Sequence, residues 1–156
     1  RFRDFGPTLS TTVGAQPVAR EPFGPTSRTT GMVFSEIMYH PAPRSDGRNL
    51  EFIEVGNARS VPETLTGWQI KGDVDYTFPD GFTLAAGDFV VIAAVPDDVR
   101  AVYGITNVLG PYTGSLPGSS GTLKLYNNGG ALRLDLTYGS RAPWPAGAST
   151  TSTCPW

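Results

Sequence analysis

The residues whose spacing could support chemistry are acidic side chains in two strand-like runs. Glu36 lies inside an apolar run, and Glu51 and Glu54 lie three residues apart in the next run. Residues three apart in a strand point to opposite faces, so Glu51 and Glu54 cannot hold one ion from the same side of a sheet. Glu36 could share a face with one of them if the two strands pair, and Asp73 and Asp75 could add further oxygen ligands. Such a group of carboxylates would be a candidate site for calcium.

Structural roles for these carboxylates are the favoured interpretation. Calcium takes about six to eight oxygen ligands, and the spacing of the acids matches no calcium-binding loop. A carboxylate within a sheet is more commonly satisfied by N–H donors. We therefore predict no metal and no cofactor, and keep Glu36, Glu54, Asp73 and Asp75 as the candidate ligands should a metal bind.

Catalytic chemistry has little support in the sequence. His40 is the only histidine; it precedes Pro41 at the end of a strand-like run, and the chain has no GxSxG nucleophile motif. No pair of carboxylates stands out as the acid and base of a glycosidase, and no glycine-rich phosphate-binding motif occurs. We therefore expect a protein that is not an enzyme.

Charge and hydropathy exclude two classes of partner. The net charge is −2 and the isoelectric point about 5.3, so no basic field attracts nucleic acid. No apolar run approaches the roughly 18 residues that a membrane-spanning helix needs. A glycan stays open as a ligand, because four scattered tyrosines could line a sugar-binding face: Tyr76, Tyr103, Tyr112 and Tyr126. The single cysteine, Cys154, cannot form an internal disulfide.

Strands separated by turns must position these residues. The chain has 19 glycines and 14 prolines, which disfavour a helical bundle because both residues break helix interiors. Strand-like runs cover residues 32–39, 50–55, 65–71, 75–78, 82–84 and 89–95. The run 89–95 is almost wholly apolar, which is typical of a central strand in a sandwich. Residues 97–104 predict a short helix with Asp97 as its N-cap and Gly104 at its end, and residues 105–121 predict a long loop.

The clearest signal is a β-hairpin over residues 122–138. Leucines alternate with polar residues in 122–126 and again in 132–138, so the leucines are expected to face the core. The segment Asn127-Asn128-Gly129-Gly130 between them supplies residues that accept positive φ angles. Short strands separated by turn residues, with one short helix, predict an all-β fold built as an antiparallel β-sandwich or barrel.

Six short motifs follow one another in an order that resembles the lamin tail domain. They are VFSEIMYHP, LEFIEVGN, LTGWQIKG, YTFPDGFTLAAGDFVVIA, GSSGTLKLYNNGGALRLDLTYG and WPAG, over about residues 32–147. The chain is similar in particular to the versions found in secreted bacterial proteins. The resemblance implies an immunoglobulin-like antiparallel β-sandwich. It also implies a binding or structural module that brings no catalytic machinery.

Four aromatic residues at matching positions are expected in the core. Trp68 follows a glycine on a strand, where a tryptophan fills the space between two sheets. Phe78 precedes a proline turn, and Phe89 begins the apolar run. Trp144 lies between two prolines and is expected to seal one end of the sandwich.

The segments flanking this domain divide the chain into three parts. We expect an extended N-terminal arm over residues 1–30, the sandwich over 31–147, and a polar C-terminal tail over 148–156. The arm could lie on its own sandwich, or on another copy or another chain, because spaced hydrophobic residues in an extended segment suit addition to a sheet edge. The expected anchors are Phe2, Phe5, Val13, Val18 and Phe23. The first residue is Arg1 rather than Met, from which we expect a processed chain or a fragment.

These features predict a non-catalytic structural protein that self-assembles into a filament or array through its N-terminal arm. The alternative is a module of a larger secreted protein that binds a surface, a glycan or another protein. The chain has only two lysines and is rich in threonine, serine and glycine, so an extracellular or cell-surface location is expected.

Overall fold

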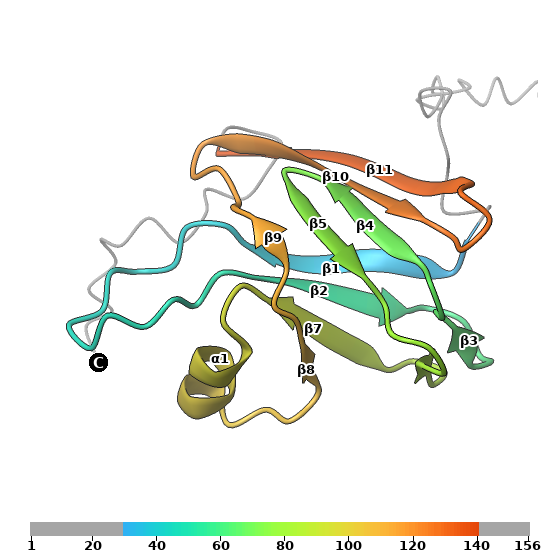
Figure 1. Cartoon of the computed structure of the whole chain (residues 1–156), viewed down its shortest axis with the longest axis horizontal. Coiled ribbons are helices and arrows are strands. Elements are labelled where there is room, and N and C mark those ends of the chain that lie inside the picture. Colours follow the sequence, from blue (N-terminus) through green and yellow to red (C-terminus); the bar gives the residue numbers. More distant parts are fainter. Residues whose placement is uncertain (1–29, 141–156) are drawn as a thin grey trace, which may run out of the picture.

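The computed structural model describes residues 30–140, which form two stacked β-sheets with one short helix, α1 (Pro96–Tyr103), beside them (Figure 1). The first sheet has the order β1-β2-β7-β8, and the second has the order β11-β10-β4-β5-β9. A separate two-stranded ribbon pairs β3 with β6. The strands are β1 (Met32–Met38), β2 (Phe52–Asn57), β3 (Glu63–Thr64), β4 (Gln69–Gly72), β5 (Val74–Thr77), β6 (Thr83–Leu84), β7 (Phe89–Ala93), β8 (Val108–Leu109), β9 (Thr113–Gly114), β10 (Ser120–Tyr126) and β11 (Leu132–Gly139).

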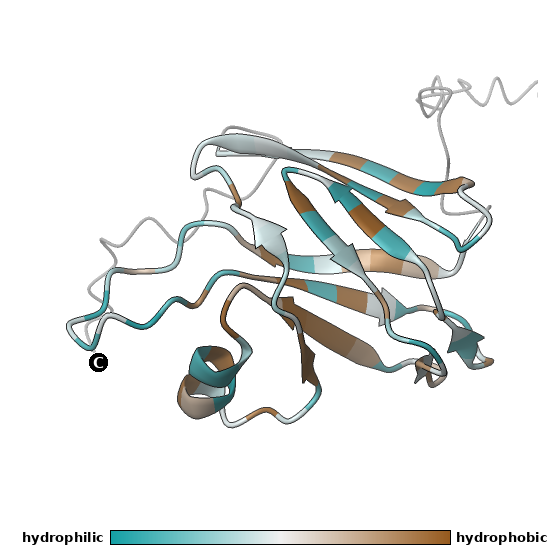
Figure 2. Cartoon of the chain, viewed as in Figure 1, coloured by the Kyte–Doolittle hydropathy of each residue, from teal (hydrophilic) through white to brown (hydrophobic). Residues whose placement is uncertain are grey.

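The main core lies between the two sheets. Hydrophobic and hydrophilic residues alternate along β4 and β11 (Figure 2), so each strand turns one face inward. Ile53 and Val90 of the first sheet meet Ile70 and Leu125 of the second, and all four are fully buried. The fold is therefore the all-β sandwich that the sequence predicts.

Trp68 and Phe78 both belong to this core. Their exposed fractions are 7% and 1%. The backbone holds the two residues together, because the Phe78 N–H donates to the Trp68 carbonyl at 2.9 Å. Phe78 stacks on Phe82 with ring centroids 5.7 Å apart. These rings fill the space between the sheets near the turn that follows β5.

The predicted hairpin is confirmed as β10 and β11. Leu123 pairs with Leu136 and Leu125 pairs with Leu134, so these leucines share one face. The turn is closed by the Asn127 N–H, which donates to the Ala131 carbonyl at 3.0 Å. Only Gly130 has a positive φ angle (+76°), so a single glycine supplies the left-handed conformation that the turn requires.

The prediction that Phe89 lies in the core is wrong, since half of this residue is exposed. Val90 and Ile92 of β7 face the other sheet, and the intervening residues face outward. Helix α1 and its flanking loop cover Val91 and Ala93 in a second apolar cluster, but this cluster ends before Phe89. The continuous apolar run predicts burial of every residue. In the structure, α1 and its flanking loop cover only part of the outer face of β7, so Phe89 remains exposed.

Residues 105–121 differ from the predicted loop. They contain β8 and β9, and β8 pairs with β7 in parallel, so the sheets are not wholly antiparallel. Two-residue strands leave too short a pattern for the sequence to show.

Helix α1 begins one residue earlier than predicted, and the expected N-cap is wrong. Val95 is the N-cap and makes no side-chain capping bond, while Pro96, which has no N–H to satisfy, occupies the first turn. Gly104 ends the helix in the left-handed conformation, as predicted.

Several sequence predictions lie outside the described residues. They are the arm anchors Phe2, Phe5, Val13, Val18 and Phe23, the end-sealing Trp144, and the C-terminal tail over 148–156.

Candidate interaction site

The acidic residues of the first sheet meet as predicted for paired strands. Glu36 of β1 lies directly opposite Glu54 of β2. The Ser35 hydroxyl donates to Glu54 Oε1 at 2.6 Å, so this carboxylate has a local partner. Partial burial raises the pKa of Glu36, and the nearby Glu54 charge raises it further. The pair therefore concentrates negative charge beside the edge of the sheet.

Asp73 and Asp75 do not join this pair, because Asp75 lies on β5 of the other sheet and Asp73 lies between β4 and β5. Asp73 Oδ2 accepts the backbone N–H of Thr122 at 2.5 Å, and Asp75 accepts Lys71 Nζ at 2.6 Å. Within residues 30–140, no group of three or more His, Cys, Asp or Glu side chains is placed to hold a metal ion. The four candidate ligands thus lie in two separate places, and Asp73 has the backbone-bonded role that the sequence favoured for such acids.

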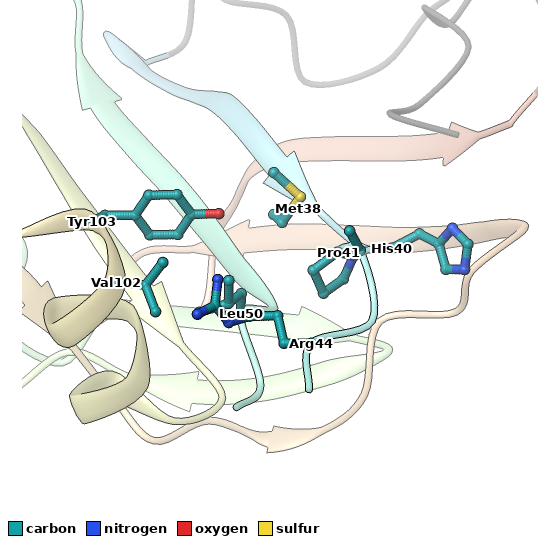
Figure 3. Close-up of a pocket in the computed structure, with 8 residues that line it drawn as sticks. Met38, His40, Pro41, Arg44, Leu50, Val102 and Tyr103 are labelled. Atoms are coloured by element: carbon teal, nitrogen blue, oxygen red, sulfur yellow. The ribbon is translucent and has the colours of Figure 1, made fainter. Parts of the chain in front are cut away.

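A shallow pocket of about 310 Å³ lies between α1 and the ends of β1 and β2. Figure 3 shows Tyr103 and Val102 reaching from α1 toward Leu50 and Arg44. Met38 completes the mostly apolar lining. The pocket can accept a small apolar group, such as the side chain of another protein.

The rim of this pocket carries an ordered cation. The Arg44 guanidinium donates to both Asp46 carboxylate oxygens, at 2.9 and 2.7 Å. This hydrogen bonding lowers the pKa of Asp46 to about 2. His40, the only histidine, is exposed, and Figure 3 shows its ring directed away from Tyr103. The polar groups at the pocket therefore orient a loop and form no nucleophile–base pair.

The two longest edge strands lie on the same side of the sandwich. β1 ends one sheet and β11 ends the other, and each has a described strand on one flank only. Their ends meet where Tyr39 lies against Tyr138, with ring centroids 5.0 Å apart. On the opposite side, the edge strands β8 and β9 have two residues each. Long pairing edges are therefore gathered on one side of the molecule.

The apolar side chains along these two edges are incompletely covered. Leu132, Leu134 and Leu136 of β11 are half-buried, whereas Leu123 and Leu125 of the adjacent β10 are fully buried. On β1, Phe34 and Ile37 pack against the core but keep part of their surface exposed. A further strand placed along either edge would cover this surface and satisfy outward-facing backbone groups.

Asn57 is a buried structural residue that the sequence analysis missed. Its Nδ2 donates to the carbonyls of Val61, Leu84 and Ala85 at 2.9 to 3.1 Å, and its Oδ1 accepts the Arg59 N–H at 3.0 Å. One amide thus joins the end of β2 to two neighbouring segments. The only signal in the sequence is an asparagine directly after an apolar strand, which also reads as an ordinary turn.

Comparison with known protein families identifies the family to which this domain belongs. The family described as the Lamin Tail Domain matches residues 25–140. The chain belongs to the lamin tail domain family. A comparison with curated proteins finds no match.

Membership in the lamin tail domain family fits the immunoglobulin-like sandwich of residues 30–140. The matched range begins at residue 25, inside the segment that the sequence analysis assigned to the arm, and ends at 140. All five expected arm anchors precede it. In the described part of the chain, no helix is long and apolar enough to cross a membrane.

Proposed function

We propose that this lamin tail domain is a non-catalytic structural module that assembles by placing its N-terminal arm on the open β1 edge of a neighbouring copy. The observation that carries the proposal is the long β1 edge, which has a described strand partner on one side only. An edge of seven residues offers backbone donors and acceptors for an added strand. Repeated head to tail, the same contact gives a filament.

The composition of the arm suits this edge. Residues 1–30 carry four arginines against one aspartate and one glutamate, a net charge of +2, and Glu36 and Glu54 lie beside β1. Opposite charge favours encounter between the two surfaces. The arm also contains Pro7, Pro17 and Pro22, and a strand interrupted by proline can pair along one side only, as an edge strand does.

The place of assembly is proposed as extracellular or on the cell surface, as in secreted bacterial members of the family. The two lysines and the many threonine, serine and glycine residues support this location. The sequence resemblance described above supports the bacterial secreted type.

Deletion of residues 1–24 tests the proposal. The deletion removes all five expected anchors and leaves the family-matched range intact. We expect the full chain to gain mass with concentration in sedimentation experiments, and the deletion variant to lose most of that growth. A full-length variant with Phe2, Phe5 and Phe23 changed to serine is a second test of the anchors and is expected to behave like the deletion. The proposal fails if the deletion variant assembles like the full chain, or if the full chain is monomeric throughout.

A module that binds a different protein is the second candidate, and the pocket beside α1 is the observation that favours it. Its lining by Met38, Leu50 and Val102 fits an apolar side chain, and Tyr103 is 45% exposed at its rim. Under this alternative, the full chain is expected to be a monomer. The substitution Val102→Arg places a charged side chain in the pocket and is expected to reduce binding of the protein to its partner. Glycan binding belongs to the same alternative and is tested on a glycan array.

A further inference from the structure

The pocket beside α1 is an uncovered part of the second apolar cluster. Met38 and Val102 pack against this cluster but are only partly buried, and both line the pocket together with Leu50. Tyr103 is held at the rim by an edge contact with Phe52, with ring centroids 6.0 Å apart, and is itself exposed. An aromatic ring placed in the pocket would therefore remove apolar surface from water.

We propose that this pocket holds Trp144 of the same chain. Trp144 lies between Pro143 and Pro145, shortly after β11 ends at Gly139. From the sequence, this tryptophan is expected to seal one end of the sandwich, and the pocket specifies the surface that it would cover. The contact is additional to the arm contact proposed above and does not depend on it.

The described chain ends on the side of the sandwich where the pocket lies. Strands β1 and β11 finish beside each other, since Tyr39 lies against Tyr138 with ring centroids 5.0 Å apart. In Figure 1, the end of β11, the loop that follows β1 and helix α1 lie toward the same end of the molecule. The segment that contains Trp144 therefore begins at this end.

A short path connects Ser140 to the pocket. The Ser140 N–H donates to the Ser119 carbonyl at 2.8 Å. At the preceding Gly118, a Cβ would lie 3.5 Å from the ring carbon Cδ2 of His40, and His40 lines the pocket. Four residue steps lead from Ser140 to Trp144, and an extended chain spans about 13 Å over that length. The long tryptophan side chain adds to this reach, so the pocket is accessible to Trp144 without a second copy.

The chemistry of the rim suits a tryptophan. Both Asp46 carboxylate oxygens hold the Arg44 guanidinium in place, and Arg44 lines the pocket. A guanidinium over the face of an indole is a favourable cation–π contact, and tryptophan is the best aromatic partner for it. Proline restricts the residue before it to extended backbone, so Pro145 limits the conformations of Trp144 and reduces the entropy lost on docking.

Occupation by Trp144 changes what the pocket can do for another protein. A partner's apolar side chain can enter only if it displaces Trp144. Binding of such a partner would therefore be coupled to release of the residues that follow β11. The second candidate function described above then includes this displacement as one of its steps.

Acrylamide quenching of tryptophan fluorescence in the full chain tests the proposal. Trp156→Phe leaves two emitting residues, Trp144 and the buried core residue Trp68. The further substitution Trp144→Phe gives the Trp68 signal alone, which is then subtracted. The remaining Trp144 signal is expected to be quenched several-fold more weakly than that of free N-acetyltryptophanamide.

A pair of matched variants locates the protecting surface. Val102→Arg, made in the Trp156→Phe background, places a charge in the pocket and is expected to remove most of the protection of Trp144. Val61→Arg is the control, because Val61 is an exposed valine that does not line the pocket. It is expected to leave the quenching of Trp144 unchanged. An unaltered Trp68 signal shows that both variants are folded.

Disulfide trapping provides a second measurement that does not depend on fluorescence. Ala42 lines the pocket, so in a Cys154→Ser background Ala42→Cys and Pro143→Cys together place one cysteine beside the pocket and one next to Trp144. Oxidation is expected to join them within one chain, which gives a crosslinked monomer. Val61→Cys with Pro143→Cys in the same background is expected to give little.

Quenching of Trp144 as strong as that of N-acetyltryptophanamide would overturn the proposal, as would protection that survives Val102→Arg. A disulfide that forms only between chains would place Trp144 in the pocket of a neighbour and overturn its assignment to the same chain. Failure of the arm proposal is read separately, since deletion of residues 1–24 leaves both Trp144 and the pocket in place.

Discussion

Glu36 shows at the level of one residue how the first sheet tolerates like charges. Its carboxylate lies opposite Glu54, and both burial and this neighbour raise its pKa. Glu54 is stabilised by the Ser35 hydroxyl, but Glu36 has mainly solvent to offset its charge. Such a position has little value for folding, so the acidic pair is better explained as a feature of the surface beside β1.

Replacing Glu36 with glutamine is expected to stabilise the protein slightly, and only where the glutamate is ionised. A carboxyl whose pKa is raised on folding is unfavourable in its charged form, so its cost appears as the pH rises above the unfolded value of 4.5 and disappears below it. We expect Glu36→Gln to gain about 0.5 kcal/mol at most near neutral pH, after allowance for solvent screening, and nothing at about pH 3. Thermal melts at the two pH values measure the difference.

The control for this measurement is Asp80→Asn, which removes an exposed carboxylate from the turn between β5 and β6. It tests whether any loss of negative charge stabilises this acidic chain. A gain for Glu36→Gln that persists at low pH contradicts the assigned cause, because Glu36 is then protonated in both states.

At the level of a single element, strand β7 shows that the burial of its outward-facing side chains depends on whether another element covers them. Val91 and Phe89 project from the same outer side of β7, but Val91 lies beneath the apolar cluster that includes α1 and Phe89 lies beyond it. Their exposed fractions are 2% and 50%. The two positions therefore form a matched pair within one strand.

Serine substitutions along β7 are expected to separate these two positions. Val91→Ser leaves a cavity and buries a hydroxyl, and should cost about 3 kcal/mol of unfolding free energy. Phe89→Ser removes a ring that is already half in water and should cost about 1 kcal/mol or less. Urea denaturation measures both. Equal costs would mean that Phe89 is covered by a segment outside the described residues.

The parts of the fold that the sequence predicts are those with long local patterns. The hairpin has five leucines in alternation around a glycine turn, and this pattern predicts the pairing of Leu123 with Leu136 and of Leu125 with Leu134. The register shift next to the turn, where Tyr126 pairs with Leu132, is not visible in the pattern. Strand β8 has two residues and exists because Val91 and Ile92 are paired beside it, which is tertiary information. The exposure of Phe89 depends likewise on where α1 ends. The edge strands were foreseen as a class, but which strands would be edges required the sheet order.

The candidate site was predictable to a similar degree. The sequence predicted that Glu36 could share a face with Glu51 or Glu54 if their strands paired, and the structure selects Glu54. The separation of Asp73 and Asp75 from this pair required knowledge of which sheet each strand joins. Asn57 escaped notice because its four partners lie between two and 28 residues away in the sequence. The bonds to Leu84 and Ala85 are non-local, and hydrogen bonds of this kind leave no periodic signal.

At the scale of the whole molecule, the symmetry of the proposed arm contact decides the form of the assembly. An arm placed on the β1 edge of the next copy joins two different surfaces, so the contact does not close on itself. The arm contact alone is therefore expected to give an open filament with one copy at each level.

Mass per unit length is therefore expected to test the arm contact in assembled material. Filaments of the full chain should contain one copy at each level, and scanning transmission electron microscopy of unstained filaments makes this measurement. Deletion of residues 1–24 should abolish the filaments, because it removes all five expected anchors. Filaments of the deletion variant with unchanged mass per unit length would show that the arm has no part in assembly, since no expected anchor remains in that variant to reach β1.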